Sequence, residues 1–373
     1  MERRTSPVEL LWDLVFVFAI TQVTTLLARD LTWAGFGRSM LVLALVWWAW
    51  SAFVWAANAQ DTSLPTLRIA LLLAMLLIFI SGLAIPGAFG SEATLFAVTY
   101  AGVRLLHLAL YADASRRGSA SWAAIAGFAV TVVIGMALLI AGSFVDDTLR
   151  IVLWTVAVAI DYAGPAWLTR ERLRGLQQVA VVHFAERYSL FIIICLGESI
   201  VTIGVGASGR QVDAELVAAV TLGLLITVGL WWTYFDSFAA TAEGRLRRHS
   251  DPVLAAADAY SYLHLVLVAG IIVFAAGEKI AIHDVGHSLS DAARLAFCGG
   301  VALFMAGQVA FRLRMGGALS RPQLGAVLAL AVLFVAGGAL DAWALAGLVT
   351  AILVAVCAIE TTRDRRAAPA LSP

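Results

Sequence analysis

The chain has 373 residues, of which 61% are hydrophobic and 13% are charged, and its formal net charge is zero. Soluble domains average about 45–50% apolar and about 25% charged residues. The mean hydropathy of +0.90 therefore excludes a water-soluble enzyme, a nucleic-acid-binding protein and a disordered protein. We expect a polytopic membrane protein whose main partner is the lipid bilayer.

Twelve apolar runs predict an all-α bundle of about twelve transmembrane helices, because about 20 apolar residues are needed to cross a bilayer. The runs span 8–27, 39–57, 68–85, 93–112, 121–142, 149–168, 183–206, 214–236, 256–279, 292–311, 322–338 and 341–360. Glu9 and Asp13 interrupt the first run, and no small-residue cleavage pattern follows it, so we interpret it as a retained helix. Only Gly337, Gly338 and their neighbours separate the last two runs, which are expected to form a hairpin or a re-entrant pair.

The basic residues alternate between the connections of these runs. If the N-terminus is inside, 17 of the 25 basic residues fall in inside connections and six fall outside. Cytoplasmic loops carry an excess of Lys and Arg, so we expect both termini to be cytoplasmic. The remaining two, Arg104 and Arg187, fall within apolar runs.

The chain divides near its midpoint into two sets of six runs. We predict a first transmembrane half over 1–168, a basic cytoplasmic loop over 169–182, and a second half with a short tail over 183–373. The second and eighth runs both carry tryptophan pairs, Trp47-Trp48 and Trp231-Trp232. Six helices in each half suggest a parallel 6+6 repeat, although aromatic belts recur in any polytopic protein. We expect these tryptophans to anchor at the membrane interface, with an aromatic-lined substrate path as the alternative.

Charged residues inside the first run are costly in a membrane. Glu9 and Asp13 are four residues apart and share one helix face. Two carboxylates there repel each other unless an arginine or a proton intervenes. They are expected to form either a protonatable pair at the cytoplasmic mouth or an interfacial cap that pairs with loop arginines.

The seventh run carries a second polar stripe. His183 lies three residues before Glu186 and four before Arg187. Glu198 follows Arg187 by eleven residues, which places it about 20° away around the helix and about 16 Å along it. Ser199 follows directly. A carboxylate at mid-membrane depth is typical of proton or cation coupling, and a structural ion pair with Arg104 or Arg187 is the alternative.

Two further runs place polar groups at depth. Arg104 and His107 are three residues apart in the fourth run, and this arginine needs an anion from the candidates Glu186, Glu198 and Asp161. Pro165 is expected to kink the sixth run at Asp161, where a freed carbonyl beside the carboxylate would bind a cation. The alternative is a helix end near the cytoplasm.

His264 and Glu278 are fourteen residues apart in the ninth run, about 40° apart on one face. We place Glu278 at the outer mouth beside Lys279 and favour a hydrogen-bonded structural role for His264 over a ligand role. The sequence HDVGH at 283–287 lacks a third ligand, so no metal and no cofactor are expected. Cys195, Cys298 and Cys357 are expected to be buried small apolar residues.

Two segments resemble a known family. ELLWDLVFVFAITQ at 9–22 and HFAERYSLFIIICLGESIV at 183–201 are similar to the signatures of the low temperature requirement protein A family of bacterial membrane proteins. The resemblance implies a multi-pass protein of the bacterial inner membrane linked to growth in the cold. The motif positions that match are Glu9, Asp13, Gln22, His183, Glu186, Arg187, Gly197, Glu198 and Ser199.

These features favour a secondary transporter of an unidentified small solute or ion, with proton coupling as one form of it. The connections between the runs are too short to hold a catalytic soluble domain. An ion channel built on the same carboxylates is the first alternative. The second is an intramembrane enzyme acting on lipid with His183, Glu186 and Glu198 as acid and base, which no nucleophile or metal pattern supports.

Overall fold

The computed structural model describes residues 5–59, 65–116, 122–164 and 180–367, and these residues are helical with no strand. The long helices are α1 (Pro7–Arg29), α2 (Trp33–Ala59), α3 (Pro65–Ala84), α4 (Ala93–Arg116), α5 (Trp122–Gly142), α6 (Asp147–Ala163), α8 (Val181–Ala207), α9 (Ala214–Thr233), α12 (His264–His283), α13 (Asp291–Arg314), α14 (Arg321–Ala336) and α15 (Ala342–Ala367). Shorter elements are the 3-10 turns η1 (Ile85–Gly87) and η5 (Gly337–Ala339), the helices α10 (Ala239–Arg248) and α11 (Pro252–Ala255), and the π-helices η3 (Tyr234–Phe238) and η4 (Ala256–Leu263).

Eleven helical segments of the described chain are long and apolar enough to cross a membrane. Within the described residues each predicted apolar run is helical over most of its length, and α6 is absent from the eleven because only 17 of its residues are described as helix. The expectation of an all-α multi-pass membrane protein is therefore confirmed. The 6+6 repeat stays a prediction. Pro165 and most of the predicted basic loop lie outside the described residues.

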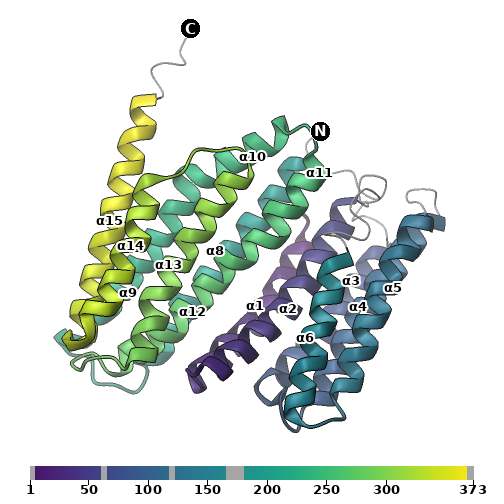
Figure 1. The fold of residues 1–373 in the computed structure, drawn as a ribbon, viewed down its shortest axis with the longest axis horizontal. Helices are drawn as coiled ribbons and strands as arrows, with labels where there is room; N and C mark the ends of the chain where they lie inside the picture. The colour runs from purple at the N-terminus through teal and green to yellow at the C-terminus, as the bar shows by residue number, and fades with distance from the viewer. Residues whose placement is uncertain (1–4, 60–64, 117–121, 165–179, 368–373) are drawn as a thin grey trace. The chain divides into compact units, whose positions relative to one another are not determined.

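The helices pack as two compact units. The first comprises Met1–Leu26, Trp33–Tyr188 and Arg247–Tyr262. Within it, α3, α4, α5 and α6 pack in chain order, and α2 packs against both α4 and α6 (Figure 1). One face of α3 buries Leu67, Leu71, Ala74 and Ile78. The opposite face exposes Leu72, Leu73, Leu76 and Phe79, which suits contact with lipid rather than water.

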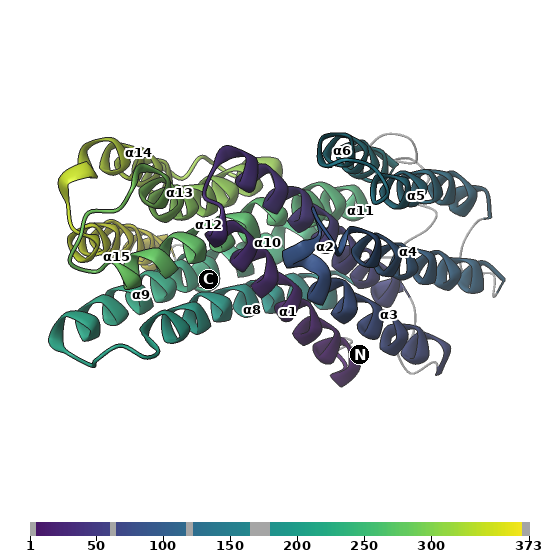
Figure 2. The same ribbon diagram turned by 90° about the horizontal axis from the view of Figure 1, so that it is seen from below.

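The second unit comprises Leu27–Thr32, Ser189–Leu246 and Leu263–Pro373. In this unit α12 packs along α13, α14 packs against α13 and α15, and α9 lies beside α15 (Figure 2). Glycines let α12 and α13 approach closely: a Cβ built on Gly300 would lie 2.2 Å from the backbone nitrogen of Phe274. A Cβ on Gly270 would lie 2.6 Å from the nitrogen of Phe304. Small residues at this seam are the usual device for close helix packing in membranes.

Candidate functional site

Four ionisable side chains from α1 and α8 form a buried group, which we call the α1–α8 ion cluster: Glu9, Asp13, His183 and Arg187. Arg187 places Nη1 3.1 Å from Glu9 Oε1 and Nη2 2.6 Å from Asp13 Oδ1. His183 Nε2 lies 3.1 Å from the same Glu9 oxygen. None of the four side chains is more than 1% exposed. The arginine therefore intervenes between the two carboxylates, as their spacing on one helix face requires.

The start of α1 fixes the position of Glu9. Its Oε2 accepts hydrogen bonds from the backbone nitrogen of Ser6 at 2.8 Å and from the Ser6 hydroxyl at 2.7 Å. This is a capping interaction at the first turn, where an acidic side chain also stabilises the helix dipole. One carboxyl oxygen of Glu9 thus caps the helix, and the other belongs to the ion cluster. Its cationic partner is Arg187, which lies within a span, and not a loop arginine.

The ion cluster is not electrically balanced by its arginine alone. Two carboxylates oppose one guanidinium, so a neutral His183 leaves one net negative charge among side chains that are fully buried. Burying an uncompensated charge costs several kcal/mol or more. One added proton makes the cluster neutral. Asp13 Oδ2 has no hydrogen-bond partner in the described structure and is a free acceptor for such a proton.

The imidazole of His183 lies between two oxygen acceptors. Its Nδ1 is 3.3 Å from Oδ1 of Asn58, and its Nε2 faces Glu9. Both ring nitrogens donate only when the ring is an imidazolium. A neutral ring that keeps its Nε2 proton toward Glu9 requires the Asn58 amide to turn its NH2 group toward Nδ1. Proton binding at His183 is thus coupled to the orientation of the Asn58 amide.

Aromatic and hydroxyl side chains surround the cluster. Trp50 donates its indole N–H to Asp13 Oδ1 at 2.8 Å, and its ring meets Tyr188 edge-on at 4.9 Å. The Tyr188 hydroxyl lies 2.8 Å from Ser51 Oγ and 3.1 Å from Ser261 Oγ. These groups were not singled out from sequence, because their role depends on contacts between helices far apart in the chain.

Ser261 belongs to the π-helix η4, a kind of segment that is frequent at functional sites. Its carbonyl accepts from the Trp47 indole at 2.6 Å and its hydroxyl accepts from the Trp55 indole at 2.8 Å. Trp47 and Trp50 are fully buried, whereas Trp33 on the same helix is 79% exposed and Trp231 and Trp232 are about 40% exposed. Anchoring of the tryptophans at the membrane interface stays a prediction.

A second buried ion pair lies in the same unit. Arg104 of α4 donates to Asp161 of α6 at 2.7 Å, and both side chains are 2% exposed or less. Of the three anions that the sequence offered to Arg104, the structure thus selects Asp161. His107, one turn after Arg104, is buried among the rings of Phe53, Tyr111 and Phe128. This pair is balanced, one cation against one anion, and ties α4 to α6.

Several predicted residues do not join the ion cluster. Glu186 is exposed and accepts a hydrogen bond from Thr5 at 3.0 Å. Gln22 is partly exposed on α1. Glu198 is buried further along α8, where it accepts from Thr202 at 3.3 Å, and Ser199 beside it is fully buried.

The two predicted residues of the ninth run both lie on α12. His264 is fully buried, and its Nε2 is 2.9 Å from the hydroxyl of Tyr234. Glu278, which the sequence places at the outer mouth, has a side chain that is only 1% exposed; its position across the membrane stays a prediction. Helix packing against α9 and α13 covers this side chain.

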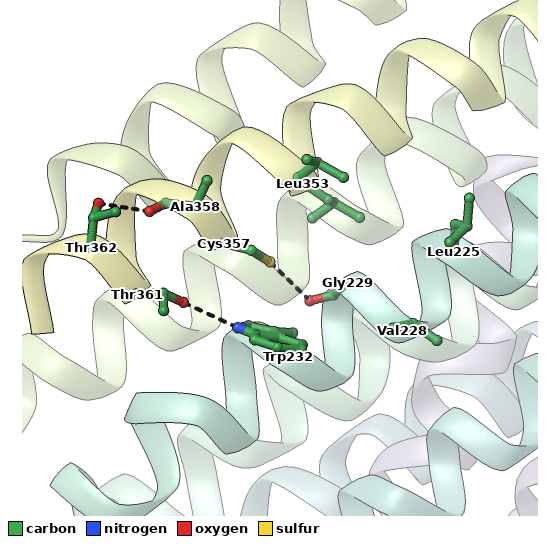
Figure 3. Close-up of a pocket in the computed structure, with 10 residues that line it drawn as sticks. Leu225, Val228, Gly229, Trp232, Leu353, Cys357, Ala358, Thr361 and Thr362 are labelled. Carbon is green, nitrogen blue, oxygen red and sulfur yellow. Dashed lines mark hydrogen bonds between the residues drawn. The ribbon is translucent and has the colours of Figure 1, made fainter. Parts of the chain in front are cut away.

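An apolar groove of about 410 Å³ lies between α9 and α15 (Figure 3). It is lined by residues that include Leu225, Val228, Trp232, Leu353 and Cys357, with Thr361 and Thr362 at one end. No lining residue is charged, and several are among the exposed apolar side chains of the unit. The groove therefore suits contact with lipid chains and carries no ion chemistry. Within the described residues no group of three or more His, Cys, Asp or Glu side chains could hold a metal ion.

Comparison with known proteins identifies relatives over most of the chain. A family model described as bacterial low temperature requirement A protein (LtrA) matches residues 4–358. An uncharacterized protein of Rhizobium meliloti (strain 1021) is 31% identical over 312 residues, which cover 82% of this chain and 76% of that protein. No solved structure matches the chain.

Proposed function

The chain belongs to the bacterial low temperature requirement A protein family, and from that premise we propose that it is a secondary transporter that couples a small solute to protons. The proposal places it in the inner membrane with both termini in the cytoplasm, in line with the alternation of basic residues. We also propose a role in growth at low temperature. A stiffer membrane slows the conformational cycle of a transporter, so the transport rate of this carrier would limit growth in the cold.

The charge imbalance of the α1–α8 ion cluster carries this proposal. Buried ionisable residues within spans mark ion paths and proton relays in membrane proteins. Here Glu9, Asp13 and Arg187 need one further positive charge, and His183 between two oxygen acceptors is placed to receive it as a proton. A cluster built only to hold two helices together needs no such imbalance, as the one-to-one pair of Arg104 and Asp161 illustrates.

The location of the cluster also supports a coupling role. Glu9 lies in the first turn of α1, and His183 and Arg187 lie in the first two turns of α8. Under the proposed orientation both helices begin at the cytoplasmic side. The cluster is closed in this structure, so we expect solute binding to accompany an opening that admits water to it.

A proton-flux assay tests the proposal. Purified protein is reconstituted into liposomes that hold a pH-sensitive dye, and a panel of ions, osmolytes, amino acids and sugars is added outside. We expect at least one solute to drive a pH change in the wild-type vesicles. Asp13→Asn should abolish that change, because the amide keeps an oxygen for Trp50 and Arg187 but removes the negative charge that creates the need for a proton.

Glu186→Gln is the matched control. It removes a carboxylate from the same helix as Arg187, but one that is exposed and bonded to Thr5, so flux should equal that of the wild type. Equal flux in Asp13→Asn and wild-type vesicles would contradict the proposal. A current that needs no solute and does not saturate would favour the channel alternative.

A further inference from the structure

A solitary carboxyl group lies in the second unit, apart from the ion cluster. Glu278 on α12 is 1% exposed, and neither carboxyl oxygen has a hydrogen-bond partner in the described structure. It forms no ion pair with any described residue. This differs from Glu9, Asp13 and Asp161, each of which faces an arginine.

The surroundings of Glu278 leave space for its carboxyl group. A Cβ built on Gly223 of α9 would lie 2.5 Å from Glu278 Oε1, so any other residue at 223 would force the carboxyl group to shift. Beside it lies a small cavity of about 10 Å³, at the lower limit of the space that one water molecule needs. The remaining cavity lining is apolar or glycine: Ala219, Gly223, Ala281, Ile282, Phe297, Ala342, Trp343 and Ala346.

The helices packed around Glu278 supply no neutralising cation. On α9 the ionisable residue is Glu215, which lies against Gly286. On α13 the near arginine is Arg294, already held by the carbonyls of Phe334 and Leu289 and by Asp291. Further ionisable residues on these elements include Glu198 on α8, Lys279, His264 and His283 on α12, Arg312 and Arg314 on α13, and Glu360 and Arg363 on α15, with Asp341 just before α15. Lys279 is adjacent in sequence and therefore points about 100° away around the helix.

We propose that Glu278 is a proton-binding site of the membrane interior, where the carboxyl group holds a proton in an apolar cavity that Gly223 keeps open. An ionised carboxylate without a partner at this depth is prohibitively costly, and the group avoids that cost by staying neutral. A metal cation is the less suitable ligand, because it requires several oxygen ligands and the cavity offers only the two of Glu278.

Infrared spectroscopy tests the protonation state directly. Wild-type protein in lipid nanodiscs at neutral pH should show a carbonyl stretch of a protonated carboxylic acid that is absent from Glu278→Gln. The glutamine variant keeps the size of the side chain and its neutral charge, so we expect it to fold. Identical spectra in the carboxylic acid region would overturn the proposal.

Chemical modification provides a test that needs no variant at Glu278. An apolar carbodiimide reacts with protonated carboxyl groups inside membranes, so mass spectrometry of the wild-type protein should locate an adduct on Glu278. Gly223→Ala should give less of this adduct, because the new methyl group takes up the space beside Oε1 and forces the carboxyl group to shift. Gly204→Ala on α8, where an added Cβ meets nothing within 4 Å, should keep it. Equal labelling of the three proteins, or no labelling of Glu278 in the wild type, would contradict the proposal.

This inference does not depend on the proposed transport function. The infrared and labelling experiments report on Glu278 alone and involve no solute. If no solute drives a pH change in the flux assay but Glu278 is labelled, the proposed role of the ion cluster is contradicted. The proposal that Glu278 binds a proton is then still supported.

Discussion

Arg187 is the residue on which the α1–α8 ion cluster depends. It contacts both carboxylates, and Trp50 and Ser6 complete the coordination of Asp13 and Glu9. Removing one partner of a buried ion pair is more harmful than the net strength of the pair suggests, because the remaining charge stays buried and unpaired. Removal of the Arg187 guanidinium would leave two buried carboxylates, Glu9 and Asp13, without their cation.

Replacement of this arginine by methionine should therefore destabilise the protein strongly. We expect Arg187→Met to lower the free energy of unfolding by about 3–5 kcal/mol, measured by thermal or denaturant unfolding in detergent. Arg29→Met, at the exposed end of α1, serves as the control and should change stability little. The double variant Arg187→Met with Asp13→Leu should be more stable than Arg187→Met alone. Wild-type stability in Arg187→Met would show that the cluster does not hold α1 and α8 together.

The members of the cluster could be found from sequence because charge inside an apolar run is rare and costly. That argument identified Glu9, Asp13, His183 and Arg187, but it assigned Glu186 and Glu198 to the same polar stripe. Residues that are three or eleven positions apart on a helix lie only approximately on the same face. In the structure Glu186 is exposed, and Glu198 accepts a hydrogen bond from Thr202 and does not join the ion cluster.

The aromatic and hydroxyl groups around the cluster could not be predicted in the same way. Tryptophan is common at membrane interfaces, so Trp50 carries no signal that it lies against Asp13. Ser51 and Ser261 are small polar residues that are unremarkable in a span. Their roles arise only when α2, α8 and η4 are packed together.

At the scale of helices, the contact between α12 and α13 is the most extensive between helices of the second unit. Two adjacent glycines of this contact, Gly299 and Gly300, cannot be told apart from the sequence alone. The structure distinguishes them. A Cβ on Gly300 would meet the Phe274 backbone at 2.2 Å, whereas a Cβ on Gly299 would meet only the Leu295 side chain at 3.5 Å.

This pair of adjacent glycines gives a matched test of the seam. We expect Gly300→Ala to cost at least about 1–3 kcal/mol of stability, because the helices must move apart to admit the methyl group. Gly299→Ala should be neutral or slightly stabilising, since alanine favours the helix. Thermal unfolding of both variants in the same detergent measures the difference. Equal effects would indicate that the two helices do not pack at this separation.

At the scale of the whole molecule, hydropathy predicts where the helices lie in the sequence but not which helices pack against one another. Every span needs about 20 apolar residues, which is why the predicted runs coincide with helices. The two packing units combine distant segments: Arg247–Tyr262 packs with the first unit, and Leu27–Thr32 with the second. An apolar surface suits any other apolar surface, so composition carries no information about this grouping.

The proposed orientation can be tested on the whole chain by reporter fusions. Alkaline phosphatase, which is active only outside the cytoplasm, should be inactive when fused at the C-terminus. The same enzyme should be active when fused after His287, in the connection between α12 and α13. This follows from the excess of arginines in the inside connections. The reverse pattern of activity would place the start of α1 outside and remove the basis for cytoplasmic access to the ion cluster.

The glycine seam also has a mechanical consequence. Because backbone approaches backbone at Gly270 and Gly300, a change of side-chain rotamer there would not let one helix slide over the other. We infer that α12 and α13 move together as one rigid body. Any motion that opens the cavity beside Glu278 must then come from the helices on its other sides, α9 and α15, which contribute Gly223 and Ala346 to its lining.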